Sequence, residues 1–206
     1  MAIALPQRKP RSPLLLADQF APHYQFERAR HRIVDAAPDE VYAAAHALDL
    51  AQIRRPLFDV LRRLCVRACP APLTLDELET RSPWTVLGEL PGEEIVFGVA
   101  GQFWRPGGDW RRLEPRDFAD FAEPGYGKLV VSLSVRPYGR RRSLVTVDVR
   151  VLLDDPASWV RFRRIWPLAG PLIGRFQAAL LCAVESAALH PHRDLAPAPA
   201  DLKEIT

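Results

Sequence analysis

Residues 143–189 decide the fold, and they read SLVTVDVRVLLDDPASWVRFRRIWPLAGPLIGRFQAALLCAVESAAL. Valines alternate with mostly polar residues over 143–153, which is the period of a strand with one buried face. We expect the face of this strand that carries Asp148 and Arg150 to be exposed to solvent. Asp154 or Asp155 is the predicted N-cap of a long apolar helix over about 156–189, with Pro156 at its start.

Two prolines interrupt this helix. Pro167 and Pro171 cannot donate the backbone hydrogen bond of their turns, and their rings crowd the preceding turn. We therefore predict a kink near 167–171. The apolar run over 165–189 also raises the question of a membrane span. It contains Arg175, Gln177 and Glu185, so we interpret it as a buried, kinked helix of a protein without a transmembrane segment.

Working back from this end, the pattern predicts further strands over 24–35, 84–90, 94–104 and 128–136, and helices over 38–48, 52–68 and 115–121. Alternation in the first strand would place His31 on its inward face. Gly98 and Gly101 remove bulk from the third strand, so we expect them to permit curvature and to border any cavity beneath it.

Composition and the positions of the prolines indicate where the domain begins and ends. Prolines and the lack of periodicity predict an extended arm over 1–22, one globular domain over 23–190 and a flexible tail over 191–206. The formal net charge is only +3, and arginine clusters alternate with acidic residues, so we expect no nucleic-acid partner. Cys65, Cys69 and Cys182 form no CxxC pair, which argues against a zinc site or a disulfide framework and favours a cytoplasmic location.

Four stretches resemble the START and pollen-allergen-like superfamily, also called SRPBCC or polyketide-cyclase/lipid-transport-like. They are FERARHRIVDAAPDEVYAAA (26–45), LGELPGEEIVFGVAGQFWRP (87–106), FADFAEPGYGKLVVSLSV (118–135) and VTVDVRVLLDDPASWVRFRRIWPLAGPLI (145–173). They are similar to an uncharacterised bacterial branch of that superfamily. The resemblance implies an α+β helix-grip fold, in which a curved antiparallel sheet wraps around a long C-terminal helix, with two short helices after the first strand. It carries over no catalytic residue.

Aromatic residues are the densest candidates for a binding site, because flat apolar rings suit the wall of a hydrophobic cavity. The candidate ligand-binding residues are Phe97, Phe103, Trp104, Trp110, Phe118, Phe121, Tyr126, Trp159 and Trp166. Each ring could equally fill a solid core. The candidate acid–base or carbonyl-polarising residues are His31, Arg105 and Tyr126, and no metal site or cofactor is predicted.

Three functions follow from these observations. The favoured one is binding or transport of a hydrophobic small molecule, such as a lipid, isoprenoid or polyketide, in an internal cavity. The second is an enzyme of the cyclase or dehydrase type that holds a polyketide in one conformation. The third is a protein-interaction module without a ligand, which an exposed apolar patch would favour. Nothing in the sequence specifies an oligomeric state.

Overall fold

A computed structural model of the chain describes residues 15–49, 74, 78, 82–105 and 108–190. The helix predicted over 52–68 lies outside the described residues. The described elements are α1 (Ala17–Phe20), β1 (Phe26–Val34), α2 (Pro38–Ala47), β2 (Thr85–Leu90), β3 (Glu94–Gly101), β4 (Trp110–Arg111), α5 (Pro115–Phe118), β5 (Gly127–Pro137), β6 (Ser143–Leu153) and α6 (Pro156–Leu189).

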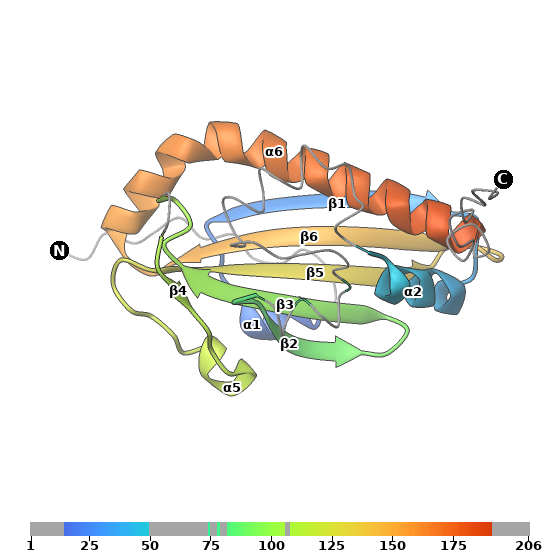
Figure 1. Cartoon of the computed structure of the whole chain (residues 1–206), viewed down its shortest axis with the longest axis horizontal. Coiled ribbons are helices and arrows are strands. Elements are labelled where there is room, and N and C mark those ends of the chain that lie inside the picture. The colour runs from blue at the N-terminus through green and yellow to red at the C-terminus, as the bar shows by residue number, and fades with distance from the viewer. Residues whose placement is uncertain (1–14, 50–73, 75–77, 79–81, 106–107, 191–206) are drawn as a thin grey trace, which may run out of the picture.

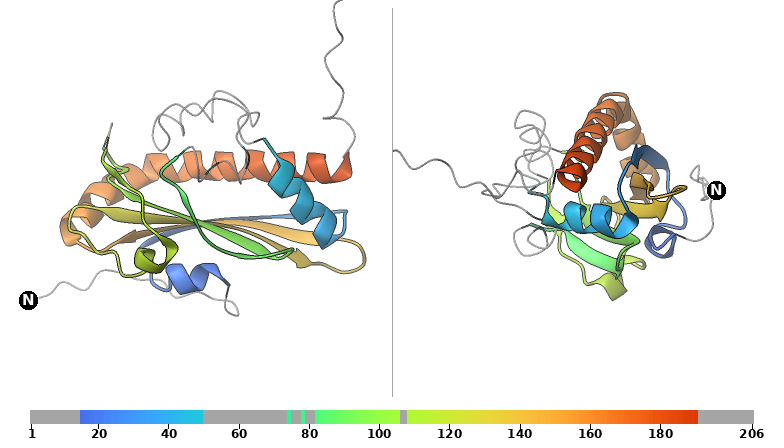
Figure 2. Two further views of the ribbon diagram at one scale, coloured as in Figure 1. Left: turned by 60° about the horizontal axis from the view of Figure 1, so that its bottom comes forward. Right: turned by 90° about the vertical axis from the view of Figure 1, so that its right-hand side faces the viewer.

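The strands of the described chain form a six-stranded antiparallel sheet in the order β1-β6-β5-β3-β2, with β4 paired to the end of β3. The helix α6 lies along one side of this sheet, together with α2, and α1 and α5 lie on the other side (Figure 1, Figure 2). We call the side that faces α6 the inner face and the opposite side the outer face. This α+β arrangement of a curved sheet against one long C-terminal helix is the helix-grip architecture.

The final strand and the long helix have the bounds that the sequence predicts. Of the two candidate caps, Asp155 is the N-cap, and its Oδ1 accepts a hydrogen bond of 2.8 Å from the Ser158 amide. Its Oδ2 accepts from the Gly125 amide at 3.0 Å, so one carboxylate joins the helix start to the loop before β5. The helix is unbroken through Pro167 and Pro171, yet its ribbon bends in the first half, as the two prolines predict (Figure 1).

By length and composition, α6 is the one described helix that could cross a membrane. A core helix of a soluble protein passes the same test, and α6 buries one side against the inner face. After Pro171, α6 packs against α2 and the valines of β6 in one apolar cluster. The cluster includes Val34, Val41, Tyr42, Ala45, Phe97, Leu133, Val135, Val145, Val147, Leu180, Leu181 and Val184. Burial of this stripe accounts for part of the apolar character of the helix, on which Val160, Leu168 and Leu189 remain exposed.

Around Asp148 and Arg150 the outer face is buried, which corrects the expectation that this face is exposed to solvent, whereas Ala29, His31 and Ile33 of β1 remain exposed on it. A second cluster there joins α1, Tyr24, α5 and the outward side chains of the sheet: Ala17, Ala21, Tyr24, Leu87, Val96, Phe118, Val130 and Leu152. With both faces covered, every residue of β3 is buried. The covering segment, residues 15–24, lies across the outer face, and we call it the N-terminal strap (Figure 2). The division between arm and domain at residue 22 stays a prediction.

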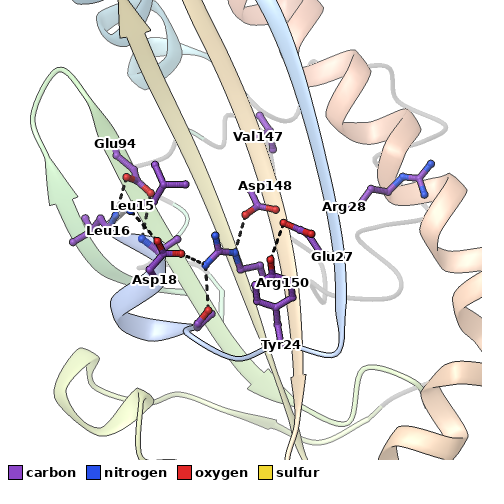
Figure 3. Close-up of polar contacts among 12 residues, drawn as sticks. Leu15, Leu16, Asp18, Tyr24, Glu27, Arg28, Glu94, Val147, Asp148 and Arg150 are labelled. Atoms are coloured by element: carbon purple, nitrogen blue, oxygen red, sulfur yellow. Dashed lines mark hydrogen bonds and ion pairs between the residues drawn. The ribbon is translucent and has the colours of Figure 1, made fainter. Parts of the chain in front are cut away.

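An ion-pair network fastens the strap to the sheet. Arg150 of β6 donates from Nη1 to Asp18 Oδ1 at 2.6 Å and from Nε to Asp148 Oδ2 at 2.8 Å, and all three side chains are buried (Figure 3). The same Nη1 reaches the Ala21 carbonyl at 3.1 Å, and the guanidinium lies over the Tyr24 ring. One arginine thus contacts the strap at three places.

A buried carboxylate of β3 holds the start of the strap. Glu94 is fully buried, and its two oxygens accept hydrogen bonds from the amides of Leu16 at 2.9 Å and Ala17 at 3.2 Å. Asp18 Oδ2 accepts from the Leu15 amide at 2.9 Å. The first amides of α1, which no helical carbonyl can satisfy, are therefore paired with carboxylates.

Burial raises the pKa of Asp148 to about 6, although the Arg150 guanidinium opposes this shift. Burial also raises the pKa of Tyr24 to about 12, and the hydrogen bond that the phenol donates to Glu27 adds to this effect. The carboxyl of Asp148 is thus the titrating group of the network near neutral pH.

Replacing Asp18 with Ala should lower the free energy of unfolding by about 3–5 kcal/mol, because it removes one partner of a buried ion pair. Urea unfolding measures this loss. The control is Asp117→Ala, which removes an exposed partner of Arg116 and should cost less than about 1 kcal/mol. Equal small losses in the two variants would contradict a network that fastens the strap.

Asp148 should also give the stability a specific pH dependence. Because its pKa is raised on folding, its favourable contribution is complete below 3.8 and is lost as the pH rises through about 6. Asp148→Asn lacks this titration, so its free energy of unfolding relative to the wild type should increase between about pH 4 and about pH 7. Urea unfolding at several pH values tests this, and a pH-independent difference would refute it.

Candidate functional site

Aromatic rings gather on the inner face beneath the first half of α6. The ring of Phe162 lies 5.0 Å from Phe26, 5.3 Å from Phe103 and 5.6 Å from Trp166, centroid to centroid. Phe103 also contacts Trp104 at 5.0 Å, and Phe26 contacts Trp166 at 5.1 Å. Phe162 and Trp166 are four residues apart, so they share one side of the helix. We call these five residues the aromatic cluster.

Six of the nine predicted ligand-binding residues lie on this side of the sheet. Phe103, Trp104, Trp110, Trp159 and Trp166 belong to the apolar cluster around Phe162, and Phe97 belongs to the neighbouring cluster under the second half of α6. Sequence reasoning missed Phe26 and Phe162. The spacing of Phe162 from Trp159 and Trp166 could have identified it, because three- and four-residue steps mark one helix face.

Phe118 does not lie on the inner face. It is fully buried on the outer face with Leu87 and Val96, so it cannot line a site beneath α6. The same correction applies to Gly98, since a Cβ added there would meet Leu87 and Phe118 at 2.6 and 2.7 Å. Gly98 therefore admits the Phe118 ring to the outer face. Gly101 lies against the Trp110 ring, where an added Cβ would come within 2.6 Å.

Phe121 and Tyr126 form a separate group at the end of the sheet near β4. Their rings meet edge to face at 6.0 Å. The Tyr126 hydroxyl donates to Asp109 and accepts from Arg111 at 2.9 Å, and Arg111 lies within 3.8 Å of Glu123. The hydrogen bond to Asp109 raises the pKa of the Tyr126 phenol, which keeps this group protonated near neutral pH.

The other two candidate catalytic residues lie elsewhere. His31 is on the outer face rather than the inward one, is exposed, and its Nδ1 lies 2.8 Å from Thr146 Oγ1. Arg105 is exposed after β3, with its Nη1 at 3.4 Å from Gln102 Oε1. His31 lies on β1, which β6 and β5 separate from β3, so His31 and Arg105 do not assemble an acid–base pair.

The inner side contains buried polar atoms without hydrogen-bond partners among the described residues. These atoms are Nε1 of Trp104, Nε1 of Trp159, Nε of Arg28 and Oε1 of Gln177. The two indoles belong to the apolar cluster around Phe162. Ser158 Oγ of α6 is a further unpaired buried atom, and Thr85 Oγ1 and Asp148 Oδ1 are others in the described chain. Because buried polar atoms are nearly always paired in folded proteins, such a group of them near α6 calls for an explanation.

Arg28 of β1 packs against α6, and Gln177 of α6 packs against β1. Gln177 is fully buried, and its Nε2 donates to the carbonyls of Arg28 at 2.6 Å and Val147 at 3.0 Å. The Arg28 side chain extends from β1 toward α6, away from the Arg150 network (Figure 3). It lies against Gly170 and Gly174, two glycines one turn apart on the helix.

No cluster of three or more His, Cys, Asp or Glu side chains suited to a metal ion occurs within the described ranges. The arrangement on the inner side instead offers aromatic surface, two indole donors, one guanidinium and one amide acceptor. Such a set can enclose an apolar molecule and hydrogen-bond a few polar groups on it.

Comparisons with known proteins add fold-level similarity only. No protein-family model matches the chain, and no curated protein does. Among solved structures, norcoclaurine synthase from Thalictrum flavum shares 12% identity over 80% of this chain and 94% of its own, with a TM-score of 0.39. An aromatase/cyclase from Streptomyces shares 12% identity over 84% and 99%, with a TM-score of 0.33.

A START superfamily protein from Mycobacterium smegmatis shares 11% identity over 80% of this chain and 98% of its own, with a TM-score of 0.34. Its name is that of the superfamily that the sequence resembles. At these values the matches carry no argument about function, and the helix-grip architecture rests on the strand order and the long helix of this chain.

The two glycines under Arg28 should respond differently to substitution. A Cβ at Gly174 would lie 2.5 Å from Arg28 Nε, whereas a Cβ at Gly170 would meet nothing closer than 3.4 Å. Gly170→Ala should therefore gain up to about 1 kcal/mol from helix propensity. Gly174→Ala should be less stable than Gly170→Ala by at least about 1 kcal/mol, because it displaces Arg28. Urea unfolding compares the two, and equal stabilities would show that Arg28 moves aside freely.

Proposed function

We propose that the protein binds or transports a hydrophobic small molecule, such as a lipid, isoprenoid or polyketide, in an internal site between α6 and the inner face. The observation that carries the proposal is the set of unpaired buried atoms on Trp104, Trp159, Arg28 and Gln177, set among apolar and aromatic side chains. A bound molecule with a few polar groups would satisfy these atoms.

A solid core is the main competing interpretation of this region. The aromatic cluster packs ring against ring at 5.0–5.6 Å, which stabilises the fold whether or not a ligand binds. A solid core does not account for the unpaired atoms, since each such group costs about 1–3 kcal/mol when it is buried without a partner. Retaining several of them beside one helix fits selection for binding better than selection for stability.

The enzymatic alternative, a cyclase or dehydrase, receives less support. Of its three candidate residues, His31 lies on the outer face, Arg105 is exposed, and Tyr126 is committed to Asp109 and Arg111. An acid–base mechanism needs its groups within reach of one substrate. None of these three meets another within the described chain.

An exposed apolar patch would favour the interaction alternative. The exposed large apolar side chains of the described residues are Ile33, Leu90, Tyr138, Val160, Leu168 and Leu189, and of these only Leu168 is more than half exposed, at 80%. We therefore retain binding as the proposed function, and with it a cytoplasmic location, which the lack of a cysteine framework favours.

The direct experiment is native mass spectrometry of the protein purified from its own host. We expect a co-purifying small molecule of mainly apolar character that denaturation releases. The same preparation after delipidation should then bind the neutral fluorescent probe N-phenylnaphthylamine. Failure to find either a co-purifying molecule or probe binding would refute the proposed function.

Truncating an aromatic residue on each face should separate binding from folding. Trp166→Ala should weaken probe binding by about tenfold, because it removes ring surface on the inner side. The matched control is Phe118→Ala, or the milder Phe118→Leu, which should lower stability by up to about 3–5 kcal/mol without changing probe affinity. Fluorescence titration and thermal unfolding of each variant measure the two effects. Equal losses of affinity on both faces would indicate a general loss of structure.

A further inference from the structure

Three arginines of β1 project toward the inner side, and they differ in exposure and in the partners of their charges. Arg28, Arg30 and Arg32 pair in register with the inward valines Val149, Val147 and Val145 of β6. Arg32 is neutralised by α6, since its Nε lies 2.7 Å from Glu185 Oε2. Arg30 is exposed to solvent. Arg28 is partly buried under the helix, where its charge needs another source of compensation.

No acidic side chain of the described chain forms an ion pair with Arg28. Its neighbour Glu27 points to the outer face, where it accepts from the Tyr24 hydroxyl at 3.0 Å (Figure 3). Glu185 is engaged with Arg32. The Arg28 Nε is buried and donates no hydrogen bond within the described residues. Burying this N–H without a partner costs free energy, which an anion or another hydrogen-bond acceptor would offset.

The surroundings of Arg28 are shaped for its side chain. Gly170 and Gly174 leave the volume that the guanidinium occupies, since a Cβ at Gly174 would come within 2.5 Å of Nε. Trp166 packs on Gly170 and contacts Phe26, so aromatic surface begins directly beside the charge. One turn further along the helix lies Gln177 with its unpaired Oε1. A cation therefore sits at the border of the aromatic cluster.

We propose that Arg28 binds the carboxylate of the hydrophobic ligand, so that the cargo of this protein is an amphipathic acid. The planar guanidinium presents parallel N–H donors that match the two oxygens of a carboxylate. The apolar body of the acid would lie against the aromatic cluster, including Trp166. A hydroxyl group near the carboxylate would donate a hydrogen bond to Gln177 Oε1. This inference rests on the proposed function and specifies the chemical class of its ligand.

The experiment compares acids with alcohols of the same shape on the full-length protein. Hexadecanoate and hexadecanol form one pair, and naphthoate and naphthalenemethanol form the other, so the pairs separate a fatty acid from an aromatic acid as the source of the carboxylate. Displacement of N-phenylnaphthylamine gives each affinity. For at least one pair, wild-type protein should bind the acid at least about tenfold more tightly than the alcohol.

Arg28→Gln should reduce this acid preference to about twofold or less while leaving the affinity for the alcohol unchanged. Arg28→Lys should retain part of the preference, because lysine keeps the positive charge but lacks the two parallel N–H donors of the guanidinium. The matched control Arg30→Gln removes an arginine from the same face of the same strand and should keep the full preference. Arg28→Met should raise the melting temperature of the ligand-free protein, since it removes a partly buried charge whose buried Nε has no partner among the described residues.

Equal affinities of wild-type protein for acid and alcohol in both pairs would overturn the carboxylate site and leave the proposed function intact. A preference that survives in Arg28→Gln would likewise overturn it. Failure of wild-type protein to bind the neutral probe or any of the four compounds would instead overturn the proposed function, and the carboxylate site with it.

Discussion

The buried guanidinium of Arg150 is the interaction on which the rest of the structure depends. Its strand runs through the sheet between β1 and β5, so its charge would face solvent if nothing covered the outer face. Asp18, Asp148 and the Ala21 carbonyl surround it, and two of these three groups are supplied by the N-terminal strap. If the strap left, Arg150 would lose Asp18 and the Ala21 carbonyl, and the apolar side chains beneath the strap would be exposed to water. The ion pair thus makes residues 15–24 an integral layer of the domain.

Closure of the outer face changes what the inner face can do. Since α1, Tyr24 and Phe118 already cover one side of the sheet, the stability of the fold does not have to come from the α6 side alone. Within the described residues, unpaired buried atoms occur on both sides of the sheet, since Asp148 Oδ1 lies on the outer face and Gln177 Oε1 on the inner side. In the proposed function those of the inner side serve ligand binding, with Arg28 as the proposed carboxylate site.

The sequence predicted the elements better than their surroundings. The valine alternation of β6 and the Asp155–Pro156 start of α6 are strong local signals, and both elements have the expected bounds. The prediction that the outer face is exposed to solvent was wrong, because a period of two distinguishes the two faces of a strand without saying what covers the second. The covering helix, Ala17–Phe20, is too short to show any periodicity. The errors at Phe118 and Gly98 share this origin, whereas His31 was placed inward because it alternates with the arginines of its strand. Of the aromatic cluster, Phe103, Trp104 and Trp166 were predicted and Phe26 and Phe162 were missed. Arg28 was not predicted, because alternation cannot tell which arginine lacks a carboxylate.

The arginines of β1 have one more consequence, which concerns contact between molecules. In the described sheet β1 is a terminal strand, so no described strand pairs with one row of its amides and carbonyls. Antiparallel pairing of two such strands would bring Arg30 of one copy beside Arg30 of the other, with Arg28 and Arg32 close by. Like charges placed opposite each other repel, and charged residues at a sheet edge resist fibril-like stacking. The strand that contributes the proposed ligand-binding cation therefore also disfavours pairing of two copies through this edge.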